Sequence, residues 1–421
     1  MTRPWEGELR PGWERKPFWS EFRRGKALGD GTEELLSVYR DYGVIPKASR
    51  DDNFNKPSED LSKYQRVVAG DLVINKMKAW QGSLGVSAHD GIVSPAYFVY
   101  TATGSLNRRY AHYLLRSRGY ADHMAAISSG IRPNQWDLDP LQLSATPLLV
   151  PPVAEQRAIA DFLDRETAQI DAFIAKNEEL ITLLTERRTN TVRVATSVGV
   201  QQNPQVVDSG VAEIGKIAAG WRMMRLSLLF GSTGSGTTPP PEFVVDFDDA
   251  DFPWVTTGEL RETRITTTLR GISKQTLATT PALKLHPKGS LLLAMYGATI
   301  GRTAILDVDA ASNQAVCALS RPRGCDVQFV EYALQASRER LILDAVGGGQ
   351  PNINQEAVRA FRIPVPPLDE QHAIVRRIRD EAERTDEAIE TARRGVELAR
   401  ERRAALISAA VTGRIDVGVS A

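Results

Sequence analysis

Apolar residues recur at alternating steps of four and three positions along two long stretches of the chain, which begin near residues 154 and 369. Such steps place the side chains of successive helical turns on one face, the seam of a coiled coil. The first seam comprises Ile159, Leu163, Glu166, Ile170, Phe173, Asn177, Leu180 and Leu184. The second, weaker and richer in small residues, comprises Ile374, Ile378, Glu381, Thr385, Ala388, Ala392, Gly395 and Ala399. We predict two long helices packed against each other as an antiparallel coiled coil.

The same start signal precedes both stretches. Pro151–Gln156 reads Pro-Pro-Val-Ala-Glu-Gln, and Pro366–Gln371, 215 positions later, reads Pro-Pro-Leu-Asp-Glu-Gln. Two prolines keep the incoming chain extended, so that a helix begins only after them. Glu155 and Glu370 then lie in the first turn, where a negative charge is favourable against the helix dipole. A start signal used twice, half a chain apart, indicates a duplicated unit.

Other segments repeat in the same order. They pair Gly7–Trp13 with Gly215–Trp221, Val68–Ile74 with Pro287–Leu293, and Gly130–Asn134 with Gly348–Asn352. The offset drifts between 208 and 219 positions, as insertions and deletions in loops would cause. A repeat of this length is typical of a pair of domains rather than of a solenoid.

Within each copy the apolar runs are short and are separated by Gly, Asn and Pro, which favours β-strands. The predicted strands include Leu72–Ile74, Tyr97–Tyr100, Leu291–Leu293 and Ala304–Leu306, and single helices are expected over Asn107–Arg118 and Val327–Asp344. The fold class is therefore α+β: two tandem mixed α/β domains, separated by the two long helices. We place the domains at residues 1–150 and 213–365, the long helices at 151–195 and 366–413, and a polar linker at 196–212.

Composition limits the classes of protein to which this chain can belong. The 421 residues contain no apolar run long enough to span a membrane, and Met1–Gly7 lacks the apolar core of a secretion signal. The two cysteines favour a reduced cytoplasm. The net charge of zero argues against nucleic acid, yet residues 61–120 carry eight basic residues against two aspartates. These basic residues are Lys63, Arg66, Lys76, Lys78, Arg108, Arg109, Arg116 and Arg118. They form either a local basic patch or an ordinary solvated surface.

No motif for catalysis is complete. Gly231–Thr238 has the glycine spacing of a phosphate-binding loop, but Thr237 occupies the lysine position and Pro239–Pro241 follows where a helix must begin. A flexible surface loop is the better interpretation, and such a loop could also lie against a DNA backbone. The five histidines have no metal-ligand spacing, no nucleophile elbow is present, and the Asn-Pro-Pro-aromatic loop of an amino-methyltransferase is missing. We expect no cofactor, no metal and no bond-making by this chain.

Polar side chains that could read DNA bases cluster in corresponding loops of the two copies. Asn and Gln can pair with adenine, and Arg with guanine, in the major groove. The loop candidates are Arg132, Asn134, Gln135 and Trp136 in the first copy, and Gln350, Asn352, Asn354 and Gln355 in the second. Pro-Asn steps are also ordinary turn formers. Residues that differ between the copies are better candidates for base recognition, namely Lys76, Lys78, Trp80, Gln81, Tyr296, Thr299 and Arg302. Trp80 could equally pack within its own domain.

Four segments resemble the hallmarks of one known family. Ser209–Gly215, with the Gly-Trp and Arg-Leu steps that follow it, resembles the opening of a target-recognition domain in type I restriction–modification specificity subunits. Met295–Arg302, Gly348–Asn354 and Pro366–Gln371 resemble three further hallmarks, in family order. The first copy departs from the pattern, because Met77–Gly82 replaces the Tyr-Gly-Ala run and Trp136 stands opposite Asn354. The resemblance covers nearly the whole chain.

The resemblance implies a non-catalytic subunit whose two target-recognition domains each bind half of a bipartite, asymmetric sequence in double-stranded DNA. It also implies that the long helices act as a spacer and as the docking surface for two methyltransferase (M) subunits, which can recruit ATP-driven restriction (R) subunits. The docking helices begin at Glu155, Gln156, Glu370 and Gln371. Two alternatives remain open: a helical scaffold that binds only proteins, and a nucleotide-dependent enzyme that uses the Gly231 loop.

Overall fold

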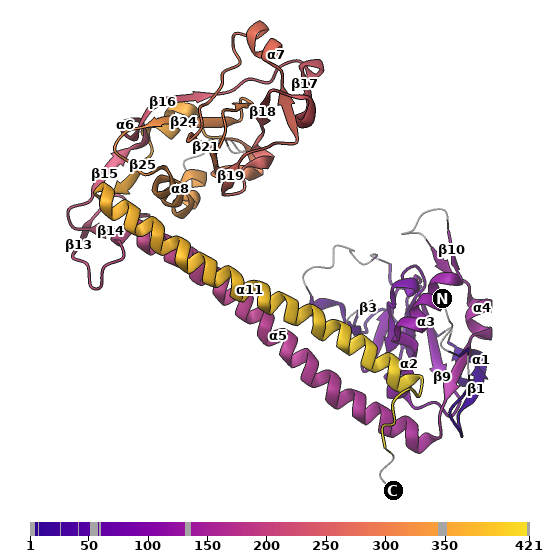
Figure 1. The fold of residues 1–421 in the computed structure, drawn as a ribbon. Coiled ribbons are helices and arrows are strands. Elements are labelled where there is room, and N and C mark those ends of the chain that lie inside the picture. Colours follow the sequence, from indigo (N-terminus) through magenta and orange to yellow (C-terminus); the bar gives the residue numbers. More distant parts are fainter. Residues whose placement is uncertain are drawn as a thin grey trace. The chain divides into compact units, whose positions relative to one another are not determined.

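The computed structural model describes residues 5–6, 8–25, 27–40, 42–50, 58, 60–130, 136–343 and 352–418. It divides into two compact units (Figure 1). The first unit combines Met1–Glu178 with Arg393–Ala421, and the second is Glu179–Ala392. Each unit therefore contains one mixed domain and one end of each long helix.

The first unit is built on an antiparallel sheet with the strand order β2-β9-β6-β7. These strands are β2 (Phe22–Arg24), β6 (Leu72–Asn75), β7 (Leu84–Val86) and β9 (Tyr97–Ala102). A separate pair joins β1 (Glu14–Pro17) to β12 (Pro147–Val150), and the helices are α1 (Phe18–Glu21), α2 (Arg108–Arg116), α3 (Arg118–Ala126) and α4 (Pro140–Ala145). The main core of the unit lies between the sheet and these helices.

The second unit repeats this plan. Its main sheet has the order β16-β24-β21-β22-β19, so the first four strands match those of the first unit one by one. The strands are β16 (Phe230–Ser235), β19 (Thr263–Ile265), β21 (Leu291–Ala294), β22 (Thr303–Leu306) and β24 (Val316–Pro322). The pair β15 (Arg222–Arg225) and β25 (Arg362–Val365) matches β1 and β12, and the helices are α6 (Leu226–Leu229), α8 (Val327–Ala336), α9 (Arg338–Leu343) and α10 (Gln355–Ala360). The predicted duplication and the four predicted strands are confirmed.

The outer parts of the two domains differ. In the first unit, two antiparallel pairs join β3 (Leu36–Tyr39) to β4 (Gly43–Pro46) and β5 (Gln65–Val67) to β8 (Gly91–Val93). In the second unit a four-stranded sheet with the order β17-β20-β18-β23 takes this place. Its elements are β17 (Val244–Asp246), β18 (Phe252–Val255), β20 (Arg270–Ile272), β23 (Ala311–Ser312) and the helix α7 (Lys274–Thr279). The divergence lies outside the shared main core, in parts that have smaller apolar clusters of their own.

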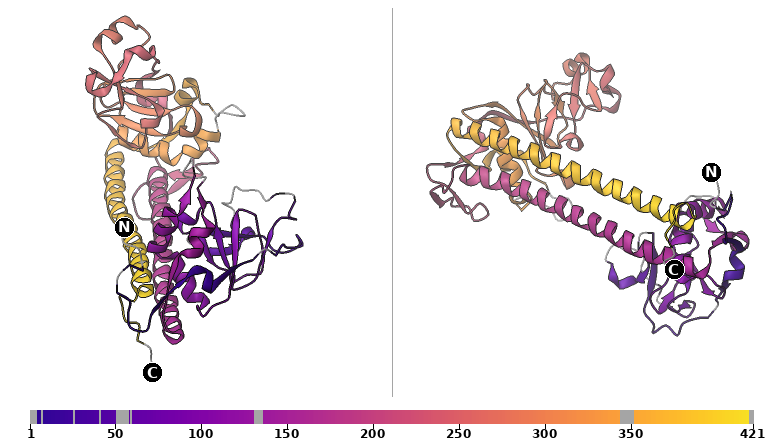
Figure 2. Two further views of the ribbon diagram at one scale, coloured as in Figure 1. Left: turned by 90° about the vertical axis from the view of Figure 1, so that its right-hand side faces the viewer. Right: turned by 60° about the horizontal axis from the view of Figure 1, so that its bottom comes forward.

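The long helices are α5 (Val153–Val198) and α11 (Leu368–Val411). In the first unit they are joined by ion pairs from Arg403 to Asp171 and from Arg400 to Glu178. In the second unit Arg188 of α5 pairs with Asp386 of α11 at 2.8 Å. In each unit the helices lie side by side and run in opposite directions (Figure 2). The predicted antiparallel packing is confirmed.

The registers predicted for the two seams are wrong in places. In α5, Phe173 and Leu180 are exposed whereas Ile174 and Ile181 are half-buried, and in α11 Val396 is buried where Gly395 was predicted. Ile374, Ile378 and Thr385 are buried as expected, but Ala388 is exposed and Ile389 is buried in its stead. An α-helix has 3.6 residues per turn, so its buried face drifts away from a strict 3.5-residue repeat unless the helices supercoil fully. A step of four residues from Thr385 to Ile389, in place of the predicted step of three to Ala388, compensates for that drift.

Two further expectations need correction. The helices predicted over Asn107–Arg118 and Val327–Asp344 are each broken, at Ser117 and Ser337, into α2 with α3 and α8 with α9; Asp344 lies outside the described residues. Ser117 is extended, and its hydroxyl donates to the carbonyl oxygen of Leu114, which closes the preceding helix. The polar linker is shorter than predicted, because α5 continues through Val198 and β13 (Val206–Asp208) pairs with β14 (Lys216–Ala218).

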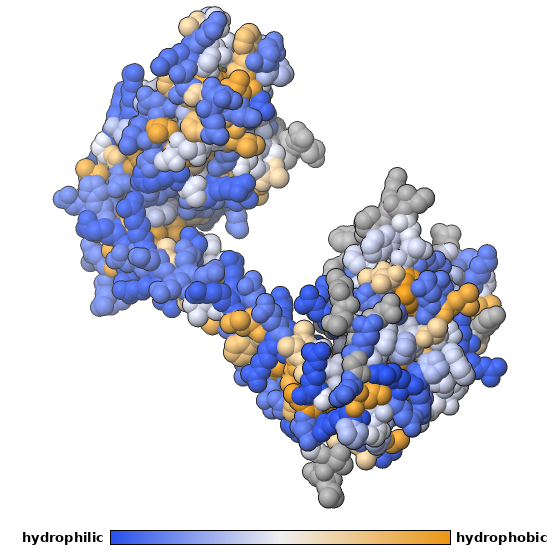
Figure 3. Space-filling view, turned by 45° about the vertical axis from the view of Figure 1, so that its right-hand side comes forward, coloured by the Kyte–Doolittle hydropathy of each residue, from blue (hydrophilic) through white to orange (hydrophobic). Residues whose placement is uncertain are grey.

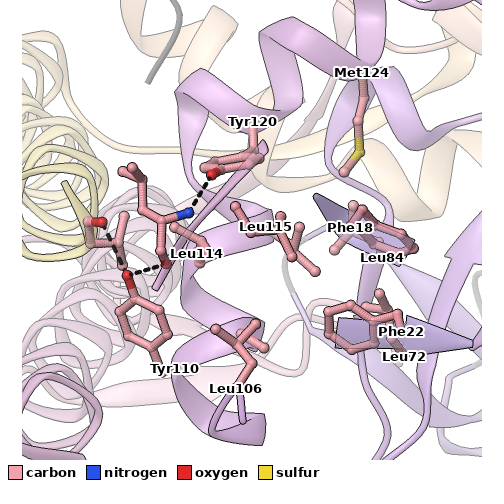
Figure 4. Packing of buried hydrophobic residues seen from close by; sticks show 14 of the residues in the cluster. Phe18, Phe22, Leu72, Leu84, Leu106, Tyr110, Leu114, Leu115, Tyr120 and Met124 are labelled. Carbon is pink, nitrogen blue, oxygen red and sulfur yellow. Dashed lines mark hydrogen bonds between the residues drawn. The ribbon is translucent and has the colours of Figure 1, made fainter. Parts of the chain in front are cut away.

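Buried tyrosines fasten the first domain together (Figure 4). The Tyr110 hydroxyl donates to the carbonyl oxygens of Leu149, at 3.1 Å, and of Val411, at 3.3 Å. The Leu149 amide donates to the Tyr120 hydroxyl at 3.2 Å. These bonds connect α2 and α3 to β12 and to the end of α11, so the chain's last helix belongs to the core of its first domain.

Candidate nucleic-acid interface

In the second domain the residues predicted to read DNA meet at the turn after β21. Tyr296 begins the turn and is 37% exposed, and η7 (Gly297–Thr299) follows it. The Thr299 hydroxyl donates to the Tyr296 carbonyl oxygen at 3.1 Å. Gly301 ends the turn at φ 75°, a left-handed conformation that suits glycine. The turn thus exposes an aromatic ring and a hydroxyl on a backbone that is fixed by the Thr299 bond and by Gly301. Arg302 follows the turn and precedes β22.

The segment before α10 lies against this turn. The Ile353 amide donates to the Met295 carbonyl oxygen at 2.9 Å, and Tyr296 forms an isolated β-bridge with Asn352. Asn354 is the N-cap of α10, because its Oδ1 accepts the Ala357 amide at 2.7 Å. The structure therefore brings the Asn354 segment to Tyr296 and Thr299, although one side-chain oxygen of Asn354 is used by the cap. Gln350 lies outside the described residues.

The first domain has the equivalent arrangement with different side chains. The Leu138 amide donates to the Lys76 carbonyl oxygen at 3.0 Å, as Ile353 does to Met295. Trp80, in η2 (Ala79–Gln81), lies 5.4 Å from Trp136 between ring centroids, and the Lys76 ammonium lies 3.8 Å from the Asp137 carboxylate. Trp80 is half-buried, so both the packing and the recognition interpretations remain compatible with it. Lys78 and Gln81 are exposed, and Arg132, Asn134 and Gln135 lie outside the described residues.

The structure corrects the predicted correspondence of Trp136 with Asn354. Asp139 caps α4 by accepting the Leu141 amide, just as Asn354 caps α10, so these two residues are equivalent. Their spacing of 215 positions equals that of the proline starts, a signal that the sequence already contained.

The glycine-rich segment is not the flexible loop that we expected. Its first part, Phe230–Ser235, is strand β16, which pairs with β24. Thr237 lies beside β23, where its amide donates to the Ser312 carbonyl oxygen at 2.9 Å and its hydroxyl donates to the Ala282 carbonyl oxygen at 3.2 Å. Gly236 is needed for this close approach of two strands rather than for a phosphate.

The basic residues of 61–120 do not form one free patch. Arg109 pairs with Asp161 and Asp164 of α5. Arg116 contacts the His112 ring, and Arg108 donates to the Ala69 carbonyl oxygen. Hydrophilic and hydrophobic side chains alternate over the visible surface, including that of the helix pair (Figure 3). Among the described residues, no group of His, Cys, Asp or Glu is arranged to hold a metal, and no helix is apolar over enough length to cross a bilayer.

Glutamines at the two helix starts clamp each domain to its own long helix. Gln156 Oε1 accepts the Asn107 amide at 2.6 Å, and its Nε2 donates to the Pro151 carbonyl oxygen at 2.8 Å. Gln371 makes the same two bonds, with the Asp326 amide at 2.8 Å and the Pro366 carbonyl oxygen at 2.9 Å. Sequence analysis missed this role, although each glutamine recurs at the same distance from its proline pair.

The clamp changes how the predicted docking residues are understood. The side chains of Gln156 and Gln371 are buried, so they are not available to a partner. Glu155 lies 3.4 Å from Arg10 of its own unit, and Glu370 accepts the Trp221 indole N–H at 3.2 Å. All four side chains therefore hold helix to domain.

The overall fold matches that of solved structures. A chain from work on complex assembly and conformational transition of the type I R-M system aligns over 97% of this chain and 100% of its own, with a TM-score of 0.70 and 16% identity. The HsdS subunit from Thermoanaerobacter tengcongensis aligns over 98% and 99%, with a TM-score of 0.53 and 17% identity. At these identities the likeness establishes the fold alone.

Similar sequences indicate the family in addition to the fold. A family described as the type I restriction modification DNA specificity domain matches residues 219–397. The type I restriction enzyme StySPI specificity subunit of Salmonella potsdam is 22% identical over 405 residues, which cover 88% of this chain and 82% of that protein. This chain belongs to the family of type I restriction–modification specificity subunits. Such a subunit is DNA-binding and non-catalytic, and methylation and cleavage lie in other subunits.

The clamp of this specificity subunit gives a first prediction. Replacing Gln156 with Met nearly keeps the volume but leaves the half-buried Asn107 amide and the buried Pro151 carbonyl oxygen without their partners. Each unpaired group costs about 1–3 kcal/mol, so we expect Gln156→Met to lower the free energy of unfolding of the first unit by about 3 kcal/mol. Urea unfolding of the full chain measures this. Glu155→Gln, which removes only a partly exposed ion pair, is the control and should cost less than about 1 kcal/mol; equal losses would contradict the clamp.

Each domain of the specificity subunit also buries a titratable side chain at the same place, between the helix after the clamp and the central sheet. In the first it is His112 of α2, whose Nδ1 accepts the Val86 amide at 3.3 Å; burial and the nearby Arg116 lower its pKa to about 3. In the second it is Glu331 of α8, which accepts the Thr303 hydroxyl at 3.2 Å; burial raises its pKa to about 7. Both groups are thus driven toward their uncharged forms.

Proposed function

We propose that this specificity subunit binds a bipartite, asymmetric sequence in double-stranded DNA and directs an adenine methyltransferase to it. Residues 1–150 and 213–365 serve as the two target-recognition domains, each reading one half-site. The observation that supports this most directly is the repeated turn: both domains join a turn after the same strand to the segment before the last short helix, and the side chains that the two turns expose differ. Two domains with the same backbone arrangement and different exposed side chains are suited to bind two different half-site sequences.

The residues that we propose to contact DNA are the candidates chosen from the sequence. They are Lys76, Lys78, Trp80, Gln81, Arg132 and Gln135 in the first domain, and Thr237, Tyr296, Thr299, Arg302, Gln350 and Asn354 in the second. Basic and aromatic side chains contact phosphates and stack on or pack against bases, while Arg, Asn and Gln recognise base edges.

The long helices serve as spacer and docking surface in this proposal. At 1.5 Å per residue, the 46 residues of α5 extend about 69 Å, which corresponds to about twenty base pairs at 3.4 Å each. Two methyltransferase subunits would dock on the helix pair, and restriction subunits would join through them. Because its substrate is cellular DNA, the complex would act in the cytoplasm.

Methylome mapping tests the proposal. The subunit is expressed with its methyltransferase partner, and methylated adenines are mapped in cells with and without it. We expect a new two-part motif with a fixed gap. Trp80→Ala should then relax only one half of the motif and Tyr296→Ala only the other. Methylation that is unchanged by removal of the subunit would favour the alternative of a scaffold that binds only proteins.

A further inference from the structure

The first recognition domain is connected to α5 by only two residues, Pro151 and Pro152. The Gln156 clamp lies within the first turn of the helix, close to this connection. Because this bond is close to Pro151 and Pro152, it resists sliding of the domain along the helix but only weakly resists rotation of the domain about the helix start. A contact further along the helix would hold the angle far better.

Such a contact exists on α2. Arg109 donates through one guanidinium nitrogen to Asp164 at 2.5 Å and through the other to Asp161 at 2.6 Å. The Tyr113 hydroxyl, one turn later on α2, donates to the second oxygen of Asp164 at 2.7 Å. Asp164 lies eleven residues into α5, about 17 Å from its start. A planar guanidinium that bridges two carboxylates on one helix face restrains direction as well as distance.

The second domain lacks this fork, although the rest of the junction is the same. Gln328 and Tyr332 occupy the places of Arg109 and Tyr113 on α8. The long helix there presents Arg379, which donates to Gln328 Oε1 at 3.2 Å, instead of a pair of carboxylates. The fold therefore forms without the fork, so Arg109 is not needed simply to attach a domain to its helix.

We propose that Arg109 is a positioning residue whose fork to Asp161 and Asp164 holds the first recognition domain at one angle to α5 and so fixes the half-site spacing that the subunit accepts. This inference rests on the proposed bipartite recognition. Without the fork the junction keeps the Gln156 clamp and the apolar packing of Ile159 and Leu163, which restrain the angle of the domain less than a fork between fixed charges does. Half-sites one base pair closer or further apart then become acceptable. The bases read within each half-site do not change, because Arg109 faces the helix.

The test uses the complex with its methyltransferase subunits and duplexes that carry the native half-sites at the native gap, one base pair shorter and one longer. We expect Arg109→Ala to reduce the preference for the native gap at least fivefold, with half-site preferences unaltered. Arg108→Ala is the matched control, since it removes the same charge from the same turn, and Arg108 donates to the Ala69 carbonyl oxygen instead of to α5. Arg109→Glu combined with Asp161→Lys and Asp164→Lys should restore the preference.

Ionic strength supplies a second measurement. The Arg109 side chain is 51% exposed and that of Asp161 is 64% exposed, so salt screens the fork. The preference for the native gap should fall with added KCl in the native protein, and it should stay low and constant in Arg109→Ala. The preference is a ratio of binding to two duplexes, so the salt dependence of the phosphate contacts common to both cancels. Full gap preference in Arg109→Ala overturns the inference. A native complex that prefers no two-part duplex overturns the proposed function instead.

Discussion

Replacing Glu331 with Gln is expected to stabilise the second unit by about 3 kcal/mol at pH 8 and to change little at pH 4.5. Burial raises the pKa of Glu331 from 4.5 to about 7, since desolvation outweighs its bonds to Thr303 and Gln328 and the nearby charge of Arg264. A carboxyl with a raised pKa in the folded state contributes stability that is fully present below pH 4.5 and is lost as the pH rises through 7. At 1.36 kcal/mol per pKa unit, ionisation above pH 7 costs about 3 kcal/mol. Gln keeps the shape without the charge.

Urea unfolding from pH 4.5 to 8, followed by hydrogen exchange in α8 and β22, measures this effect. The native second unit should weaken as the pH rises toward 8, and the Glu331→Gln variant should lose this weakening. His112 supplies an internal comparison, because its lowered pKa makes the first unit weaken in the opposite direction, as the pH falls below about 6.5. A native second unit whose stability does not change between pH 4.5 and 8 would contradict the burial of an ionisable Glu331.

Gly236→Ala is expected to cost the second unit about 3 kcal/mol or more. A Cβ at this position would stand 1.7 Å from the Ser312 carbonyl oxygen and 2.5 Å from its hydroxyl. The carbonyl cannot withdraw easily, because it accepts the Thr237 amide at 2.9 Å. Overpacking of a buried site by one carbon commonly costs 1–3 kcal/mol, and here the obstacle is backbone rather than a flexible side chain. Thermal and urea unfolding of the full chain measure the loss.

Gly234→Ala is the matched control, in the same glycine run. No atom lies within 4 Å of a Cβ added there, so we expect a change within about 0.5 kcal/mol. Equal effects of the two substitutions would show that the glycines serve flexibility rather than the close approach of β16 and β23. The comparison also bears on the nucleotide-binding alternative, which requires both glycines to be free in a loop.

Local patterns predicted most of the fold. The heptad steps and the paired proline starts identified both long helices, because helix periodicity and proline geometry act over a few residues. Apolar runs located β6, β9, β21 and β22 for the same reason. The errors occurred where local rules compete. Serines at 117 and 337 end helices that hydropathy alone would continue, and the 3.6-residue turn moves the buried position from Ala388 to Ile389.

The candidate interface was predictable only in part. Tyr296, Thr299, Lys78 and Gln81 were identified as differences between two aligned copies, and the structure places them on equivalent turns. The match of Asp139 with Asn354 was missed, although the two residues are as far apart as the two proline starts; the structure shows it because each residue caps a helix. Gln156 and Gln371 were assigned to subunit docking because the family resemblance implied it, whereas both side chains are buried and hydrogen-bonded to residues more than forty positions away.

The sequence by itself determined that this protein is a doubled unit with two long helices and no complete catalytic motif, because repetition, periodicity and motif spacing are properties of the chain. Only the tertiary structure decided which side chains hold each domain to its helix, and which carboxyl and imidazole lose their charge. Those outcomes depend on burial and on hydrogen-bond partners brought together from distant parts of the chain, and no local pattern encodes them.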